Sequence, residues 1–327
     1  MTMIIKILLT LAVGIVVVYG LLWLLSFRTF DVSYGVSFNQ NHATSLGLDW
    51  KVAYEDMLKE LQPTYVRIAA LWSAVEPQPG IYRYEDVDWM MDMAQTYGAK
   101  VTLVIGQKAP RWPECYVPNW ADQSSERELI EYIQRTTERY KDHAALDMWQ
   151  VENEPFIQFR FGDCEKYNPD AIVAEIETVR SLDKDHQIVV TDSGELGFWY
   201  SAGKAGDVFG TTVYRVVRNP GGSVFTYDWL PAAVYRVKAK LFSIDVDSMI
   251  ISELQAEPWF TESNPLNTSI EEQEQTMNPD RMKKNIEYVR HIGSRRAYFW
   301  GVEWWYFMKQ EHQDGRYWEI AKETLAG

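Results

Sequence analysis

The chain has 327 residues, of which 46% are hydrophobic and 14% aromatic, including 14 tryptophans. This composition is too apolar for a disordered protein, and the length suits one large barrel or two medium-sized domains. Acidic residues outnumber basic ones by 46 to 32, and this formal net charge of −14 argues against nucleic acid and against anionic lipid surfaces as partners.

Residues 7–27 form an apolar segment without a charged side chain, between Lys6 and Arg28. At about 1.5 Å per helical residue, such a segment is long enough to span a hydrocarbon core of ~30 Å. A secretory signal has a shorter apolar region of roughly 7–15 residues and a small-residue cleavage site, which we do not find after this segment. We therefore expect residues 1–29 to be an uncleaved signal anchor, a transmembrane helix that leaves residues 30–327 outside the cytoplasm. Cleavage of this segment and secretion of the remainder is the alternative.

After this segment, short β-branched or aromatic runs alternate with helical patterns, as in βα units around a parallel sheet. The expected strands lie at 32–38, 65–71, 100–106, 146–153, 187–193, 207–214, 248–254 and 296–304. Helical patterns fall between them at 50–61, 84–97, 124–142, 168–181, 229–240 and 279–291, and 316–325 would close the cycle. Eight strands with interleaved helices fit a (β/α)8 barrel better than a doubly wound sheet. A dinucleotide-binding sheet would also show a glycine-rich turn after its first strand, which "GVSFNQN" does not supply.

Two glutamates occupy the expected C-terminal ends of strands, where a (β/α)8 barrel carries its active site. Glu154 lies between Asn153 and Pro155, and the proline marks the end of the fourth strand because it cannot continue a sheet ladder. Glu253, in "ISEL", lies at the corresponding end of the seventh strand. Two carboxyl groups at the same end of a barrel are typical of a glycosidase active site, which needs one group as acid and the other as nucleophile or base. For either glutamate alone, the alternative is a structural salt bridge to a nearby arginine or lysine.

Two further glutamates compete with this pair. Glu152 lies two residues before Glu154 and hence on the same strand face, so we expect it in the layer below, as a buried carboxylate with a cationic or hydrogen-bonding partner. Glu257 lies in the loop after the seventh strand, roughly 13 Å beyond Glu253 if the strand continued at ~3.3 Å per residue. It would reach the site only if that loop folded back over the barrel.

Three segments resemble those of the retaining (β/α)8 glycoside hydrolases grouped as clan A. "WQVENEP" at 149–155 is similar to their acid/base segment, "ISELQAEPW" at 251–259 to their nucleophile segment, and residues 66–105 to their second βα unit. The likeness extends over essentially all of 33–305. The resemblance implies hydrolysis of O-glycosidic bonds by double displacement, on a β-linked poly- or oligosaccharide and without a cofactor. The alternatives are a catalytically silent carbohydrate-binding barrel, and an inverting or transglycosylating enzyme on the same scaffold.

The resemblance also implies roles for individual residues. Glu154 would be the general acid/base and Glu253 the nucleophile. Asn153 would hydrogen-bond the sugar 2-hydroxyl, an interaction that strengthens in the transition state. Arg67 would keep the nucleophile ionised, or would form a plain salt bridge at the edge of the core. Tyr214 would donate a hydrogen bond to the nucleophile, with a buried core tyrosine as the alternative.

Two tryptophans complete the expected sugar-binding residues. Trp300, on the eighth strand, would form the floor of the sugar subsite, because aromatic faces pack against the apolar faces of pyranose rings; the alternative is a core tryptophan. Trp72, in the segment that resembles the second βα unit, is the other substrate-binding candidate.

The two cysteines, Cys115 and Cys164, fall in the loops expected after the third and fourth strands. Adjacent strands put both loops on the same face, and a cysteine pair in an exported domain can be bridged, so we expect a disulfide. The five histidines and two cysteines show no spacing typical of metal ligands, so we expect no metal site.

Overall fold

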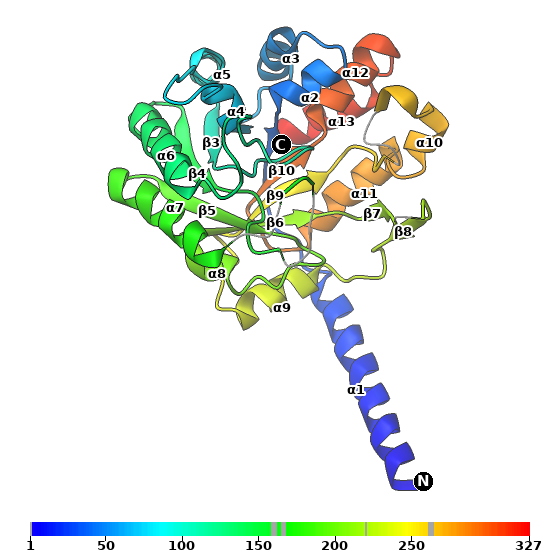
Figure 1. Ribbon diagram of the computed structural model, residues 1–327. Helices are drawn as coiled ribbons and strands as arrows, with labels where there is room; N and C mark the ends of the chain where they lie inside the picture. Colours follow the sequence, from blue (N-terminus) through cyan, green and yellow to red (C-terminus); the bar gives the residue numbers. More distant parts are fainter. Residues whose placement is uncertain (1, 158–161, 165–167, 220, 261–264) are drawn as a thin grey trace.

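In the computed structural model, eight parallel strands close into a barrel surrounded by helices, and a long N-terminal helix projects from it (Figure 1). The structure describes residues 2–157, 162–164, 168–219, 221–260 and 265–327. Each predicted strand coincides with one barrel strand, so the predicted (β/α)8 fold is confirmed. In chain order these are β1 (Ser33–Ser37), β2 (Tyr65–Ala69), β3 (Lys100–Ile105), β4 (Leu146–Val151), β5 (Gln187–Asp192), β6 (Val208–Val213), β9 (Ile250–Gln255) and β10 (Arg296–Trp300).

The helices outside the barrel follow the predicted pattern closely. Those that match are α3 (Trp50–Asp56) with its π-helical continuation η1 (Met57–Leu61), α5 (Glu85–Thr96), α6 (Glu126–Tyr140), α7 (Pro169–Leu182), α9 (Ala233–Leu241), α11 (Pro279–Arg290) and α13 (Arg316–Leu325). Elements that the pattern did not predict are α2 (Gln40–Ser45), α4 (Trp72–Val75), α8 (Ala202–Ala205), η2 (Pro265–Asn267), α10 (Ile270–Glu274), α12 (Val302–Glu311) and the hairpin of β7 (Val216–Arg218) and β8 (Val224–Thr226).

The predicted end of the last strand was wrong. The apolar run 296–304 reads as one strand, but β10 stops at Trp300 and α12 starts at Val302. Gly301 between them has φ 133, and a Cβ at this position would collide with Glu257. This conformation, which side chains rarely adopt, turns the chain directly from strand into helix.

The lower half of the barrel is filled by side chains. Tyr65, Met148, Val189, Val208, Ile250 and Tyr298, each from a different strand, form one buried cluster. The hydroxyl groups of Thr102 on β3 and Tyr298 on β10 lie 2.8 Å apart, a contact between strands that are not neighbours and that therefore crosses the barrel interior. This packed layer confines any cavity to the other end, where the strands finish.

The N-terminal helix α1 (Thr2–Leu25) is long and apolar enough to cross a membrane between Met3 and Leu25. Its last turns contact the barrel domain. The Tyr19 hydroxyl donates to the Trp229 carbonyl (2.5 Å), and the Ser26 hydroxyl after the helix accepts from the Ala233 N–H of α9 (2.9 Å). Figure 1 shows the rest of α1 leaving the domain beside α9.

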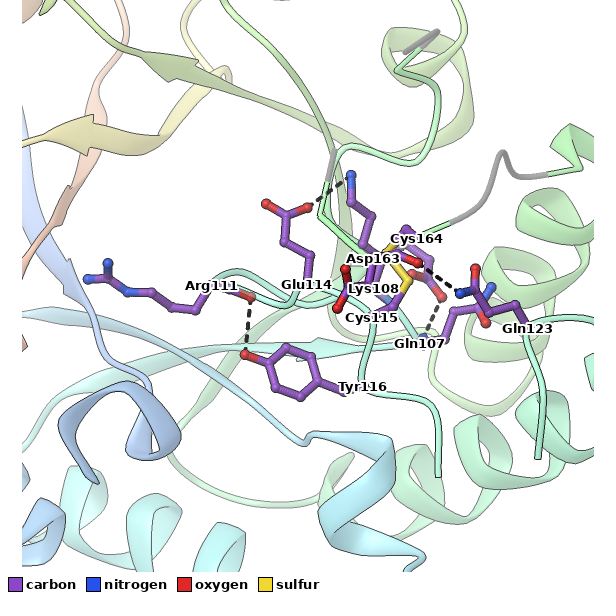
Figure 2. Close-up of a disulfide and its surroundings, with 10 residues drawn as sticks. Gln107, Lys108, Arg111, Glu114, Cys115, Tyr116, Gln123, Asp163 and Cys164 are labelled. Carbon is purple, nitrogen blue, oxygen red and sulfur yellow. Dashed lines mark hydrogen bonds and ion pairs between the residues drawn. A yellow bond between two sulfur atoms is a disulfide. The ribbon is translucent and has the colours of Figure 1, made fainter. Parts of the chain in front are cut away.

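Cys115 and Cys164 form the expected disulfide, with their Cα atoms 5.2 Å apart (Figure 2). The bridge joins the loop after β3 to the loop after β4. A second contact joins the same two loops: the Gln123 side-chain amide donates a hydrogen bond to the Asp163 carbonyl (3.0 Å). The bridge thus holds the two loops together at the end of the barrel where the strands finish.

Removal of this bridge should weaken the fold. The bridge closes a loop of 49 residues, and the chain-entropy model assigns such a closure about 4 kcal/mol. We expect the double variant Cys115→Ser, Cys164→Ser to lose free energy of unfolding by up to that amount, measured by urea titration. A thiol titration of the denatured wild-type protein should find no free thiol, and two reactive thiols would refute the bridge.

Candidate active site

Glu154 and Glu253 line one cavity of about 430 Å³ at the C-terminal end of the barrel. Tyr214, Thr212 and Trp300 lie in the same wall. Both glutamates are buried, with 8% and 5% of their surfaces exposed. The structure therefore brings together the two carboxyl groups that lie 99 positions apart in the chain.

Irregular backbone conformations orient the side chains of both glutamates toward the cavity. The register of β9 shifts near Ser252 against both neighbouring strands, a β-bulge that re-orients the side chain of Glu253. β4 ends at Val151, and Glu154 then adopts φ 46, a left-handed conformation that is uncommon outside glycine and concentrates at functional sites. Contrary to prediction, β9 does not end at Glu253 but continues to Gln255.

Arg67 on β2 links the ends of three strands. Its side chain is 1% exposed. Toward β4, Nε donates to Gln150 Oε1 (2.8 Å) and Nη2 donates to Asn153 Oδ1 (2.9 Å). Toward β9, Nη1 donates to Glu253 Oε1 (3.1 Å) and to the Ser252 carbonyl (3.2 Å). Glu253 is thus paired directly with a buried cation.

The second oxygen of Glu253 accepts a hydrogen bond from the Tyr214 hydroxyl (2.8 Å). Burial, followed by the charge of Glu253, raises the pKa of Tyr214 well above its usual value, so this hydroxyl keeps its proton. Arg67 and Tyr214 thus hold Glu253 from two sides.

Glu154 has a very different environment. Its Oε1 receives only a long hydrogen bond from Thr212 Oγ1 (3.5 Å) among the contacts of the described residues. Burial first, and the charge of Glu253 second, raise its pKa well above the ordinary value. A carboxyl group with a raised pKa and a carboxyl group paired with a buried cation therefore share one cavity, an arrangement that suits an acid and a nucleophile.

Glu152 is a buried carboxylate with hydrogen-bonding partners, as predicted, but it does not face the layer below. The strand has already ended, and Glu152 adopts φ 59, so the alternation of a strand no longer applies. Its oxygens accept the N–H groups of Gln107 (2.7 Å) and Lys108 (2.6 Å) in the loop after β3. It also interacts with Glu175 on the outer helix α7, whose pKa is raised well above its usual value by burial and then by Glu152.

Glu257 does reach the cavity wall, two residues beyond the end of β9, and the N–H of Ala256 just before it still pairs with the Trp300 carbonyl of β10 (3.0 Å). Arg111 pairs with Glu257 and with Glu303 at the start of α12 (2.7 Å to Glu303 Oε2). His42, Glu257 and Glu303 lie close enough together to offer metal ligands. The guanidinium of Arg111 already binds both carboxylates, so a metal ion there would have to displace it.

The two predicted tryptophans differ in position. Trp300 lines the cavity, and the Arg111 guanidinium lies 4.0 Å from the centre of its ring. Trp72 is fully buried outside the cavity lining, where it stacks on Tyr132 and donates to Glu76 Oε2 (2.9 Å).

Sequence reasoning missed Arg111, Glu114 and Glu303. Glu114 lines the cavity and pairs with the buried Lys108 (3.2 Å), and burial raises the pKa of Glu114 to about 7 (Figure 2). The available signal was the position of "GQKAPRWPECY", whose charged residues directly follow the third strand at the end of the barrel that carries the site. Glu303 was hidden because the pattern extended the last strand through it.

The sequence model of glycosyl hydrolase family 10 matches residues 59–166, a segment from η1 to just beyond Glu154. The β-galactosidase BgaB of Geobacillus sp. strain Y412MC61 is 28% identical over 131 residues, which cover 32% of this chain and 19% of that protein. The chain thus spans about a fifth of the length of this curated relative.

Solved structures with the same fold include the cold-adapted β-galactosidase of Rahnella sp. R3, with a TM-score of 0.59 and 12% identity over 92% of this chain and 56% of that one. An exo-β-1,4-mannosidase of Opitutaceae bacterium strain TAV5 gives a TM-score of 0.56 and 13% identity, over 83% of this chain and 52% of that one. At these identities the likeness shows a shared (β/α)8 fold. The predicted resemblance to clan A glycoside hydrolases is confirmed.

The raised pKa of Glu154 makes stability depend on pH. The folded state keeps a proton that the unfolded chain releases above its ordinary pKa of 4.5. The contribution of Glu154 to stability is therefore complete below that value and is lost as pH rises toward the folded pKa. We expect the free energy of unfolding of Glu154→Gln, relative to wild type, to increase as pH rises above that ordinary value, by at most roughly 1.4 kcal/mol per pH unit.

Urea titrations at several pH values measure this difference. The matched control is Glu323→Gln, at an exposed position on α13, which should give a difference that does not vary with pH. A flat difference for Glu154→Gln as well would contradict the raised pKa.

Proposed function

We propose that this protein is a retaining β-glycosidase in which Glu154 is the general acid/base and Glu253 the nucleophile. The observation that carries the proposal is the contrast between the two carboxyl groups in one cavity. Glu253 contacts a buried guanidinium and a tyrosine hydroxyl, whereas no cation among the residues that the structure describes contacts the buried Glu154. The family-model match and the glycosidase neighbours support hydrolysis of β-linked sugars.

In the first step, Glu253 attacks the anomeric carbon while Glu154 gives its proton to the glycosidic oxygen. The bond between that carbon and oxygen breaks, the aglycone leaves as an alcohol, and the sugar remains on Glu253 as an ester. Arg67 and Tyr214 hold Glu253 in place for attack. Asn153, fixed by Arg67, presents its side-chain amide to the sugar 2-hydroxyl.

In the second step, the changed charge of Glu253 alters the role of Glu154. The charge of Glu253 helps to raise the pKa of Glu154, and ester formation removes this charge. The pKa of Glu154 therefore falls once the ester has formed, and its carboxylate can take a proton from water as the water attacks the anomeric carbon. The sugar leaves with its original configuration, and both carboxyl groups return to their starting states.

The cavity wall favours a neutral sugar. Glu114, Glu195 and Glu257 line it together with the reacting pair, and a uronic acid would add another negative charge among them. A β-linked neutral poly- or oligosaccharide is therefore the proposed substrate class.

The proposed location is the outer surface of a membrane. α1 would anchor the chain, with residues 30–327 outside the cytoplasm. The hydrogen bond that Tyr19 donates to the barrel domain and the one that Ser26 accepts from it support a helix that stays attached, because they make its last turns part of the folded domain.

Replacement of the two glutamates should separate their roles. We expect Glu253→Ala to lower kcat on aryl β-glycosides by at least about 1,000-fold, with azide restoring turnover and giving a glycosyl azide of inverted configuration. Azide with Glu154→Ala should give a glycosyl azide of retained configuration, detected by NMR. Mass spectrometry after trapping with a fluorinated sugar should find the label on Glu253. A label on Glu257 or Glu152 would overturn the assignment, and an absence of wild-type turnover would favour a silent binding barrel.

The anchor can be tested by fractionation. Full-length protein should sediment with membranes and resist extraction by high salt, because apolar burial is not weakened by ionic strength. A fragment that begins at residue 30 should remain soluble. Full-length protein with an intact N-terminus in the soluble fraction would refute the anchor.

A further inference from the structure

The loop after β6 connects the cavity to α1. At its beginning lies Tyr214, whose hydroxyl binds Glu253, and Tyr227 further along also lines the cavity. At its end lies Trp229, whose carbonyl accepts the hydrogen bond from Tyr19 of α1. The same loop therefore carries part of the candidate active site and the contact with the apolar helix.

The contacts of α1 give its direction. Phe30 donates its N–H to the carbonyl of Arg290, the last residue of α11, and Arg236 on α9 binds the Leu25 carbonyl (2.9 Å). Tyr19, nearer the N-terminus of α1, contacts Trp229 in the segment that precedes α9. α1 thus runs beside α9, and its apolar N-terminal part continues past the end of the domain from which the loop after β6 emerges.

The length of the apolar segment then fixes the depth of this loop. If the whole domain were to stay in water, only residues 3–18 of the candidate span would cross the hydrocarbon, and these span about 24 Å of helix. A bilayer core needs ~30 Å. The bilayer must therefore extend past Tyr19 toward Leu25, so that Trp229 lies at the depth of the lipid head groups or below them.

The side chains of the loop near Trp229 suit a position at the depth of the lipid head groups. Phe225 and Trp229 are 45% and 52% exposed, and Tyr227 lies between them. The ring centres of Phe225 and Tyr227 are 5.0 Å apart, and those of Tyr227 and Trp229 are 6.4 Å apart. These three residues form an aromatic series that leads from the cavity to α1. Aromatic side chains of this kind, tryptophan and tyrosine above all, favour the boundary between membrane and water.

We propose that the aromatic series Phe225, Tyr227 and Trp229 rests in the head-group region of the membrane, so that the cavity takes glycolipids. This substrate class depends on the proposed function. The glycan would be the neutral head group of a membrane lipid, since its glycosidic bond lies at the height of the cavity mouth. A neutral or zwitterionic membrane fits the net charge of −14, which disfavours an anionic surface.

The first test measures depth and does not depend on activity. The full chain is placed in dioleoylphosphatidylcholine vesicles with a nitroxide on Phe225→Cys, because the native cysteines are paired and will not react. A control label goes on Val52→Cys, an exposed position on α3 at the opposite side of the domain from α1 (Figure 1). The label at 225 should be open to oxygen and shielded from a water-soluble nickel chelate, and the label at 52 should show the reverse. Equal exposure of both labels to the chelate would overturn the membrane contact.

The second test uses pairs of substrates that share one sugar, either galactose, glucose or mannose. One member is a soluble aryl β-glycoside, and the other is a dioleoylglycerol β-glycoside in the same vesicles as the full chain. In the double variant Phe225→Ser, Trp229→Ser, we expect turnover of the glycolipid to fall about tenfold and turnover of the aryl glycoside to change less than about twofold. Val52→Ser, an exposed apolar residue away from the membrane, should change neither.

The outcomes separate the two proposals. Turnover of aryl glycosides without turnover of any glycolipid would overturn the substrate class and leave the hydrolase in place. Equal losses on both substrates in the double variant would mean that the series supports the cavity and not the approach of lipid. Turnover of neither substrate by wild type would refute the proposed hydrolase and the substrate class together, while the nitroxide depth would still decide the membrane contact.

Discussion

The buried guanidinium of Arg67 is the interaction on which the candidate site depends. A charge with 1% of its surface exposed is stable in a protein only when it is fully paired and hydrogen-bonded. Arg67 meets this condition through Gln150, Asn153 and Glu253, which belong to strands on different sides of the barrel. The packed layer of side chains beneath it excludes water from below. Removing any one partner would leave a charge or a polar group unpaired, so the position of each partner is set by the others.

This pairing also gives the two carboxyl groups of the cavity different environments. Among the described residues, the guanidinium contacts the carboxyl group of Glu253 and not that of Glu154, and burial and the negative charge of Glu253 are the main influences on the pKa of Glu154. Two identical side chains thereby have opposite electrostatic environments within one cavity. The bulge in β9 and the left-handed residue after β4 are part of the same arrangement, since regular strands would not direct both carboxyl groups into the cavity.

The sequence predicted what depends on local pattern. The eight strands are visible as short apolar runs, and Glu154 and Glu253 are visible because each follows such a run. Arg111 and Glu303 were missed because their role comes from a tertiary contact, a guanidinium between two carboxylates on different segments. Trp72 failed to reach the cavity for a related reason: α4 begins at this residue and turns its ring into the space beside Tyr132. Burial alone cannot distinguish a sugar platform from a core tryptophan in a sequence with so many aromatic residues.

The loop after β6 contacts both β9, which carries Glu253, and α1, two elements that are far apart in the sequence. Within it, Arg215 donates its N–H to Gln255 on β9 (2.9 Å) and its guanidinium to the Tyr227 carbonyl. Its start is thus tied to the strand that carries Glu253, and its end is tied to α1 through Trp229. A soluble barrel would gain nothing from exposed aromatic residues at this point, because their contact with water is unfavourable. In the anchored arrangement that we propose, the bilayer reaches Tyr19, and this gives a physical reason to keep aromatic residues at the boundary between membrane and water.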